Sequence, residues 1–129
     1  MPDSSAFLDF WRERHLCTVT TLRPDGTPHV VPMGVVVDPD SGTAWAITSG
    51  TSRKVANIRA AGDEGARVAV CQVDGARWST LEGRARVRDD EDGVAEAVRR
   101  YTERYRVPRE NPSRVALHIE VTRVLGNAR

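Results

Sequence analysis

Two basic residues, Arg53 and Lys54, follow a cluster of serine, glycine and threonine at positions 48–52. The pattern predicts that a strand ends in this cluster and that a short helix begins after Thr51. A helix N-terminus carries the positive end of the backbone dipole and several unpaired N–H groups, so cations there are normally unfavourable. They become favourable when an anion such as a phosphate binds among them and the nearby hydroxyls. The sequence therefore indicates an anion site centred on Lys54, the only lysine of the chain; a solvated surface turn is the alternative.

Other side chains with catalytic potential are scattered. The three histidines, His15, His29 and His118, share no metal-binding spacing, and the two cysteines, Cys17 and Cys71, lie in separate apolar runs. We interpret the cysteines as free, buried thiols and predict no metal site. The chain also lacks the glycine-rich nucleotide motifs, the G-x-S-x-G nucleophile motif and the H-E-x-x-H zinc motif. No catalytic side chain can be assigned, which is compatible with a reaction performed by a bound cofactor.

Composition narrows the class of protein. With 129 residues the chain suits a single domain, which we expect to span residues 1–129. Its formal net charge of +1 argues against a broad nucleic-acid-binding surface. No apolar run approaches the roughly 20 residues of a membrane span, and the N-terminus has no signal-peptide core. We therefore expect a cytoplasmic protein that binds a small molecule, with no membrane or nucleic-acid partner.

The elements that would hold the anion site are mostly strands. Apolar runs between turn signals predict six strands, at residues 16–22, 28–37, 43–48, 67–73, 78–87 and 115–124. Helical spacing predicts three helices, one from Ser4 or Ser5 to about His15, one after Thr51, and one with an acidic start at 89–92. Pro32 and Gly34 predict a bulge or bend within the second strand. Short antiparallel strands joined by turns favour a small barrel over a parallel sheet.

Three segments, taken in this order, resemble a known family. They read TTLRPDGTPH at 20–29, TSGTSRKVAN at 48–57 and WSTLEGRA at 78–85. The order and spacing are similar to those of the pyridoxamine 5′-phosphate oxidase-like split β-barrel family. Within it, the chain looks most like the actinobacterial deazaflavin-dependent branch, which includes biliverdin reductases. The segments NPSRV at 111–115 and RVLG at 123–126 resemble the start and end of the family's last strand.

The resemblance implies a mainly β (α+β) fold, a six-stranded antiparallel split β-barrel with about three short helices, which forms homodimers. It also implies a cofactor cleft at the dimer interface. Lys54 would be the principal phosphate ligand, with Ser52, Arg53 and Asn57 nearby. Thr48 and Ser49 would meet the ring or its side chain, and the backbone of Met33 and Gly34 would contact the ring. Gln72, Val73 and Trp78 would line the same cleft, often from the second protomer; for Trp78, a place in the core of the dimer interface is the alternative.

The implied activity is that of an oxidoreductase. Coenzyme F420, an 8-hydroxy-5-deazaflavin, would donate a hydride to an unsaturated small molecule such as a biliverdin-like tetrapyrrole. Two alternatives stay open at this point. One is an FMN-dependent oxidase or reductase on the same barrel, and the other is a non-catalytic flavin or deazaflavin carrier or sensor. The resemblance supplies no proton donor, and we interpret Tyr101 and Tyr105 as packing residues of the third helix.

Overall fold

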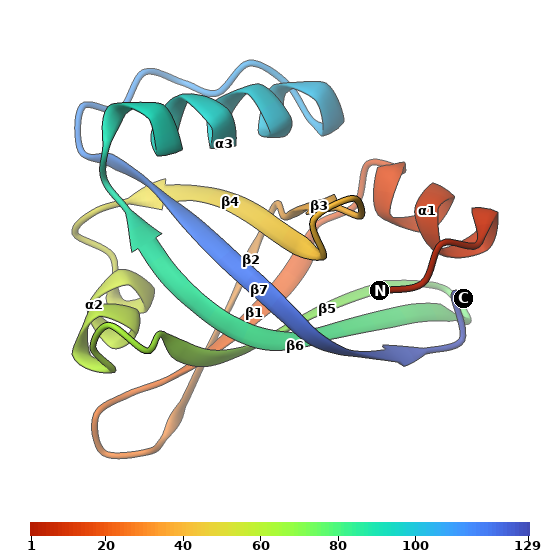
Figure 1. Cartoon of the computed structure of the whole chain (residues 1–129), viewed down its shortest axis with the longest axis horizontal. Coiled ribbons are helices and arrows are strands. Elements are labelled where there is room, and N and C mark those ends of the chain that lie inside the picture. The colour runs from red at the N-terminus through yellow and green to blue at the C-terminus, as the bar shows by residue number, and fades with distance from the viewer.

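The computed structural model describes all residues from Met1 to Arg129. The chain forms seven strands, with three helices placed before and between runs of strands (Figure 1). In order they are α1 (Ser5–Arg12), β1 (Cys17–Leu22), β2 (Pro28–Met33), β3 (Val36–Asp38), β4 (Thr43–Ser49), α2 (Arg53–Ala60), β5 (Ala66–Asp74), β6 (Arg77–Arg88), α3 (Glu91–Arg104) and β7 (Arg114–Gly126). None of the helices has the length and apolar character needed to cross a membrane.

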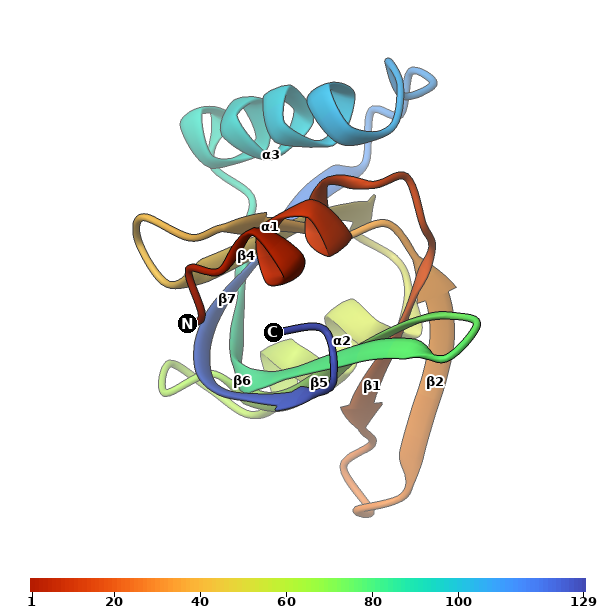
Figure 2. The ribbon, with the colours of Figure 1, turned by 90° about the vertical axis from the view of Figure 1, so that its right-hand side faces the viewer.

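The strands form one antiparallel sheet with the order β2-β1-β5-β6-β7-β4-β3. Its two edge strands, β2 and β3, are consecutive in the chain and are separated only by Gly34 and Val35. The sheet must therefore curl until its edges meet, and Figure 2 shows the resulting ring of strands. The edges do not pair with each other, so the barrel has a seam at Gly34–Val35. The mainly β, antiparallel split-barrel architecture is confirmed.

The predicted count of six strands is wrong by one. A single strand was expected over 28–37, but the chain leaves the ladder at Gly34 and Val35 and re-enters the sheet at its other edge as β3. Pro32 does not cause this break, because it stays in β2 opposite Thr18. A proline is tolerated there because β2 is an edge strand and one side of its backbone needs no donor.

The core fills the barrel and is closed at its ends by two helices. Phe7, Phe10 and Trp11 of α1 are buried and belong to the same apolar cluster as Val55 and Ile58 of α2. Figures 1 and 2 show α1 and α2 at opposite ends of the barrel. Helix α3 lies outside the barrel, across β4 and β7, over a smaller cluster of Trp45, Ala97 and Ala116. Each helix buries one apolar face, as amphipathic spacing requires.

Candidate functional site

The start of α2 combines positive charge with unused hydrogen-bonding groups. Ser52 is the N-cap residue but makes no capping bond, and its Oγ atom is buried without a partner. The first turn contains no acidic residue, and its backbone N–H groups have no partner within the helix. Lys54 is partly buried and forms no ion pair, and this burial lowers its pKa. An anion bound here would satisfy the Ser52 hydroxyl and stabilise the charged form of Lys54.

The turn before α2 is held by a distant loop. The Gly50 N–H donates to the Ser113 carbonyl at 2.7 Å, and a Cβ atom at Gly50 would lie 2.9 Å from that same oxygen. The Ser49 and Ser113 hydroxyls are 2.9 Å apart, and Asn111 Oδ1 accepts from both the backbone N–H and the hydroxyl of Ser113. The residue at position 50 must therefore be glycine, and the loop at 111–113 fixes the geometry of the anion site.

A pocket of about 300 Å³ continues from this turn along the end of β4. Its wall includes three predicted site residues, Met33, Gly34 and Thr48. The remaining lining residues are Leu16, Ile47, Tyr101, Asn111 and Arg114. Among these, Asn111 and Arg114 were not predicted as site residues, although the segment that holds them was recognised. Their polarity next to Pro112, just before a strand, was the available signal.

The seam beside this pocket is held by α3. The Val35 N–H donates to the Tyr105 hydroxyl at 3.3 Å, and that hydroxyl donates to the His15 carbonyl at 2.6 Å. The Val35 carbonyl accepts from the Arg104 guanidinium. Both polar backbone groups of Val35, which leave the strand ladder, are thus satisfied by neighbouring residues of α3. The prediction that Tyr105 packs against the sheet is incomplete, because its hydroxyl also positions the bend.

Gln72 lies in the interior and not in the open pocket. Its side chain is 0% exposed, its Nε2 atom donates to the Phe10 carbonyl at 2.7 Å, and its Oε1 atom accepts from Arg104 at 2.5 Å. The Cys17 thiol also donates to Oε1, at 3.4 Å. The side chain has therefore no free group for a cofactor in this chain. Through its hydrogen bonds with Phe10, Cys17 and Arg104, Gln72 connects α1, β1 and α3 to β5.

Asn57 is also buried, at 3% exposure, against β1. Its Nδ2 atom donates to the Thr21 hydroxyl at 2.9 Å, while its Oδ1 atom is buried without a partner. Val73 and Trp78 differ from both, since they are exposed by 61% and 40% and face each other across the β5–β6 hairpin. That hairpin lies at the opposite end of the barrel from α2 (Figure 1). Within one chain the pocket therefore brings together Met33, Gly34 and Thr48, while Ser52 and Lys54 lie at the start of α2 outside its lining, and Val73 and Trp78 lie on a separate hairpin.

A separate cluster of Glu13, His15 and Asp74 has side-chain oxygen and nitrogen atoms close enough for a metal ion. Arg77 already binds both carboxylates, at 2.8 Å from Glu13 and 2.5 Å from Asp74. Hydrogen bonds from Arg77 and His15 lower the pKa of Glu13 to about 2. This cluster is an ion-pair network that joins the end of α1 to the β5–β6 hairpin.

Comparisons with known proteins agree with this geometry. The family model of pyridoxamine 5′-phosphate oxidase matches residues 4–128. The chain belongs to the pyridoxamine 5′-phosphate oxidase family. Within this group of proteins, it is 48% identical over 126 residues to the F420H(2)-dependent biliverdin reductase of Mycobacterium tuberculosis (strain CDC 1551 / Oshkosh). The match covers 98% of this chain and 87% of that relative.

Solved structures show the same fold. A conserved hypothetical protein from Mycobacterium tuberculosis superposes with a TM-score of 0.77 at 25% identity, over 98% of this chain and 85% of its own. An F420 reductase superposes with a TM-score of 0.74 at 22% identity, over 97% and 98%. The family predicted from the three sequence segments is thereby confirmed.

Proposed function

We propose that this protein is a coenzyme F420-dependent oxidoreductase that reduces an unsaturated small molecule of the biliverdin-like tetrapyrrole class. The observation that carries the proposal is the start of α2, where Lys54 forms no ion pair and the buried Ser52 hydroxyl has no partner. The preceding turn is tied through Ser113 to Asn111, which lines the open pocket. The F420H(2)-dependent relative, 48% identical over nearly the whole chain, supports this choice of cofactor.

The residues present suit a phosphate-bearing ring cofactor. Lys54, Ser52 and the first N–H groups of α2 would bind the phosphate, with Arg53 at its edge. Thr48, Ser49 and the backbone of Met33 and Gly34 would lie along the ring. When bound in its reduced form, the deazaflavin supplies the hydride. The chain's own contribution would be to bind and orient the cofactor and to remove part of the water from around its ring.

The pocket wall includes no histidine, cysteine or carboxylate, and Tyr101 carries its only phenol. The Tyr105 hydroxyl next to the pocket already donates to the His15 carbonyl. Burial raises the pKa of Tyr105 well above its ordinary value, which makes its proton harder to lose. We propose that solvent delivers the proton to the product.

The second protomer would complete the site. Val73 and Trp78 lie far from Lys54 within one chain, so they join the same cleft only if another copy supplies them (Figure 1). Val73, Trp78 and Val30 are large apolar side chains exposed on β5, β6 and β2, and exposed apolar side chains gathered on one sheet favour association. We therefore propose a homodimer with a cofactor cleft at each interface. We also propose that residues 1–129 act as one cofactor-binding domain in the cytoplasm, where the free thiols of Cys17 and Cys71 stay reduced.

FMN is the second candidate cofactor, because the family model is that of pyridoxamine 5′-phosphate oxidase and the same phosphate site would serve either ring. Purification from a host that makes flavins but no deazaflavin separates the two. A colourless protein that binds added F420 tightly, and then oxidises F420H2 only when biliverdin is present, supports the proposal. A yellow protein that retains FMN and ignores F420 contradicts it. Tight F420 binding with no turnover of any acceptor would identify a carrier or sensor instead.

A further inference from the structure

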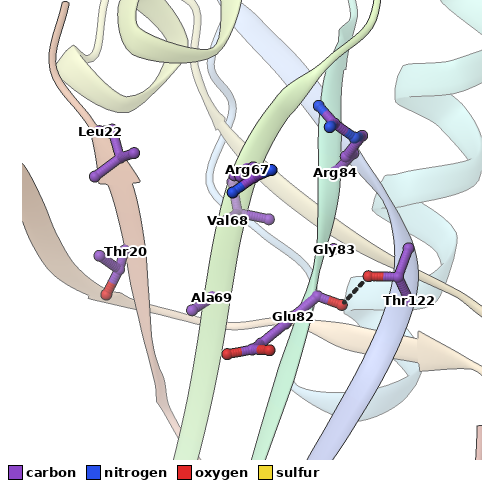
Figure 3. Close-up of a pocket in the computed structure, with 9 residues that line it drawn as sticks. All are labelled: Thr20, Leu22, Arg67, Val68, Ala69, Glu82, Gly83, Arg84 and Thr122. Atoms are coloured by element: carbon purple, nitrogen blue, oxygen red, sulfur yellow. Dashed lines mark hydrogen bonds between the residues drawn. The ribbon is translucent and has the colours of Figure 1, made fainter. Parts of the chain in front are cut away.

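A groove of about 440 Å³ lies on the flank of α2 opposite the pocket described above. The C-terminal half of α2, the β1–β2 hairpin and the first residues of β5 form its walls. It shares Leu22, Arg67 and Arg84 with a shallower depression of about 470 Å³ on the outer face of the sheet (Figure 3). The two form one continuous surface feature, called the arginine groove below.

Two unpaired arginines lie side by side in the arginine groove. Arg67 and Arg84 stand directly opposite each other on β5 and β6, where like charges repel. Neither forms an ion pair, and Arg84 has only a 3.4 Å contact with the Gly65 carbonyl. A third arginine of the groove, Arg23, bonds only to Thr27 and the Pro28 carbonyl. Elsewhere some exposed arginines, such as Arg99, are paired with carboxylates, while others, such as Arg14 and Arg106, are unpaired like these; what distinguishes Arg67 and Arg84 is that they stand side by side.

Three acidic residues lie near the arginine pair, but none forms an ion pair with it. Glu120 stands opposite Arg84 on β7, and its carboxylate is 3.9 Å from Arg86. Glu82 lines the sheet part of the groove, but its carboxylate lies toward Ala69 and away from both guanidinium groups (Figure 3). Its Oε1 atom is 4.0 Å from Arg123 instead. Glu64 lines the other part and has no carboxylate contact with Arg67 or Arg84 within 4.0 Å. The groove therefore keeps a positive end at Arg67 and Arg84.

A buried polar group points independently to a ligand. Asn57 lines the groove, is 3% exposed, and has one end of its amide without a partner. The other end contacts the Thr21 hydroxyl, which is able to donate or accept. The amide can therefore be placed either way round, so its unpartnered end, which is itself buried, is either a carbonyl oxygen or an NH2 group. An unsatisfied buried group of this kind is costly unless a ligand or water satisfies it.

We propose that the arginine groove is a binding subsite for a small anion that carries carboxylate or phosphate groups. Two guanidinium groups side by side match the paired oxygens of such groups, and the unsatisfied amide of Asn57 lies in the same groove wall. Anion binding also removes the repulsion between Arg67 and Arg84. The inference does not depend on the cofactor or on the reductase activity, because the groove and the proposed cofactor pocket share no lining residue.

Isothermal titration of the purified, cofactor-free protein with citrate and with inorganic phosphate tests the proposal. Citrate should bind with a millimolar or lower dissociation constant, and the Arg67→Gln/Arg84→Gln variant should bind it at least about tenfold more weakly. Arg14→Gln/Arg106→Gln removes the same charge from exposed positions elsewhere and should bind as the parent protein does. Comparison of the citrate and phosphate arms shows which of the two oxygen-bearing groups the site prefers.

The folded state of the variant is checked separately by thermal unfolding without added anion. Arg67→Gln/Arg84→Gln should be at least as stable as the parent protein, because the opposed charges are gone. If citrate affinity fell equally in both double variants, the binding would be a general attraction to positive charge, and the proposal would be overturned. An affinity unchanged by Arg67→Gln/Arg84→Gln, or no binding of either anion at millimolar concentration, would overturn it as well.

Discussion

Gly34 is packed so closely against Tyr105 that a Cβ atom at position 34 would lie 2.8 Å from Cε2 of the tyrosine ring. Tyr101 Cε2 would be 3.1 Å away. Two rings of α3 therefore press directly on the backbone at the barrel seam, beside the pocket proposed to hold the cofactor. This contact explains why the two edges of the sheet meet where they do.

The Gly34→Ala variant should lose about 1–3 kcal/mol of unfolding free energy, because the added methyl group forces the tyrosine rings or the seam to move. Urea unfolding measures this loss. In the double variant Gly34→Ala/Tyr105→Ala the closest contact, with the Tyr105 ring, is absent and only the 3.1 Å approach to Tyr101 remains, so the two changes should be non-additive by about 1 kcal/mol or more. Simple additivity would show that the ring does not constrain Gly34.

Replacement of Arg104 by methionine should cost about 3 kcal/mol or more. Arg104 is 8% exposed and donates to the Val35 and Glu13 carbonyls and to Gln72 Oε1. The variant would leave only weak 3.4 Å contacts to two of these acceptors, from Tyr105 to Val35 and from Cys17 to Gln72. Arg104→Lys should recover only part of this loss, because an ammonium lacks the planar fork that reaches several acceptors. Arg99→Met, on the exposed face of α3, is the matched control and should change stability by about 1 kcal/mol or less. Comparable losses in the two methionine variants would contradict the role given to Arg104.

The anion site predicts a specific binding defect. Lys54→Ala should weaken F420 binding at least about tenfold, since a hydrogen bond to a charged group contributes roughly 1.5–3 kcal/mol. Fluorescence titration of the cofactor measures the affinity, and circular dichroism shows that α2 is retained. Arg59→Ala, in the last turn of the same helix, serves as the control and should bind normally. Equal affinities for all three proteins would remove the phosphate role of Lys54.

The proposed homodimer can be tested by placing a charged residue on the exposed apolar face that carries Val73. Val73→Asp should convert the dimer to a monomer at micromolar concentration and weaken cofactor binding at the same time. Val107→Asp is matched to it, because Val107 is equally apolar and 76% exposed but lies after α3. Size-exclusion chromatography with light scattering gives the mass of each variant. A Val73→Asp protein that remains dimeric would place the interface elsewhere.

The pH dependence of stability should show two separate falls. Burial, followed by the nearby Arg88 and Arg86, lowers the pKa of His118, with Arg100 acting in the same direction and Asp38 against it. The unfolded chain then binds this proton more readily, so stability is retained above about pH 6.5 and decreases below it. Hydrogen bonds from arginines lower the pKa values of Glu13 and Glu96 to about 2, which gives a second decrease between about pH 4.5 and 2.

The His118→Phe variant isolates the first of these falls. The His118 ring is stacked on Trp45 with centroids 4.1 Å apart, and phenylalanine keeps that contact without a titrating group. Urea unfolding at pH 7.5 and 5.5 should therefore show a smaller difference for the variant than for the parent protein. An identical difference in the two proteins would mean that another group titrates in this range.

Much of this architecture follows from local patterns in the sequence. Period-two alternation located most of the strands, and the Ser/Gly/Thr cluster before Lys54 located the start of α2 within a residue or two. The same alternation also indicates that Gln72 is buried, which the sequence prediction of a cleft residue did not take into account. Gln72 follows Val68 and Val70 on the inward face of β5, so its buried position was readable despite its polarity.

The rest depends on contacts between residues distant in sequence. Arg104 lies on the same helical face as Ala97 and Tyr101. Nothing in the local sequence of α3 indicates that its guanidinium group will donate hydrogen bonds to Gln72 and to the Val35 carbonyl. The separation of the 28–37 run into two edge strands follows from the closure of the whole sheet. The packing of Ser113 on Gly50 likewise requires β4 and β7 to pair first.

Closure at the seam also sets an order for the appearance of structure during synthesis. Strand β4 can join the rest of the sheet only through β7, which comprises residues 114–126. The residues of α3 that hold Val35 lie 69 and 70 positions after it. On the ribosome, β1 to β4 therefore emerge as two unconnected hairpins with open edges, which are prone to aggregation until the later strands arrive. Release of β7 converts them in one step into a closed ring.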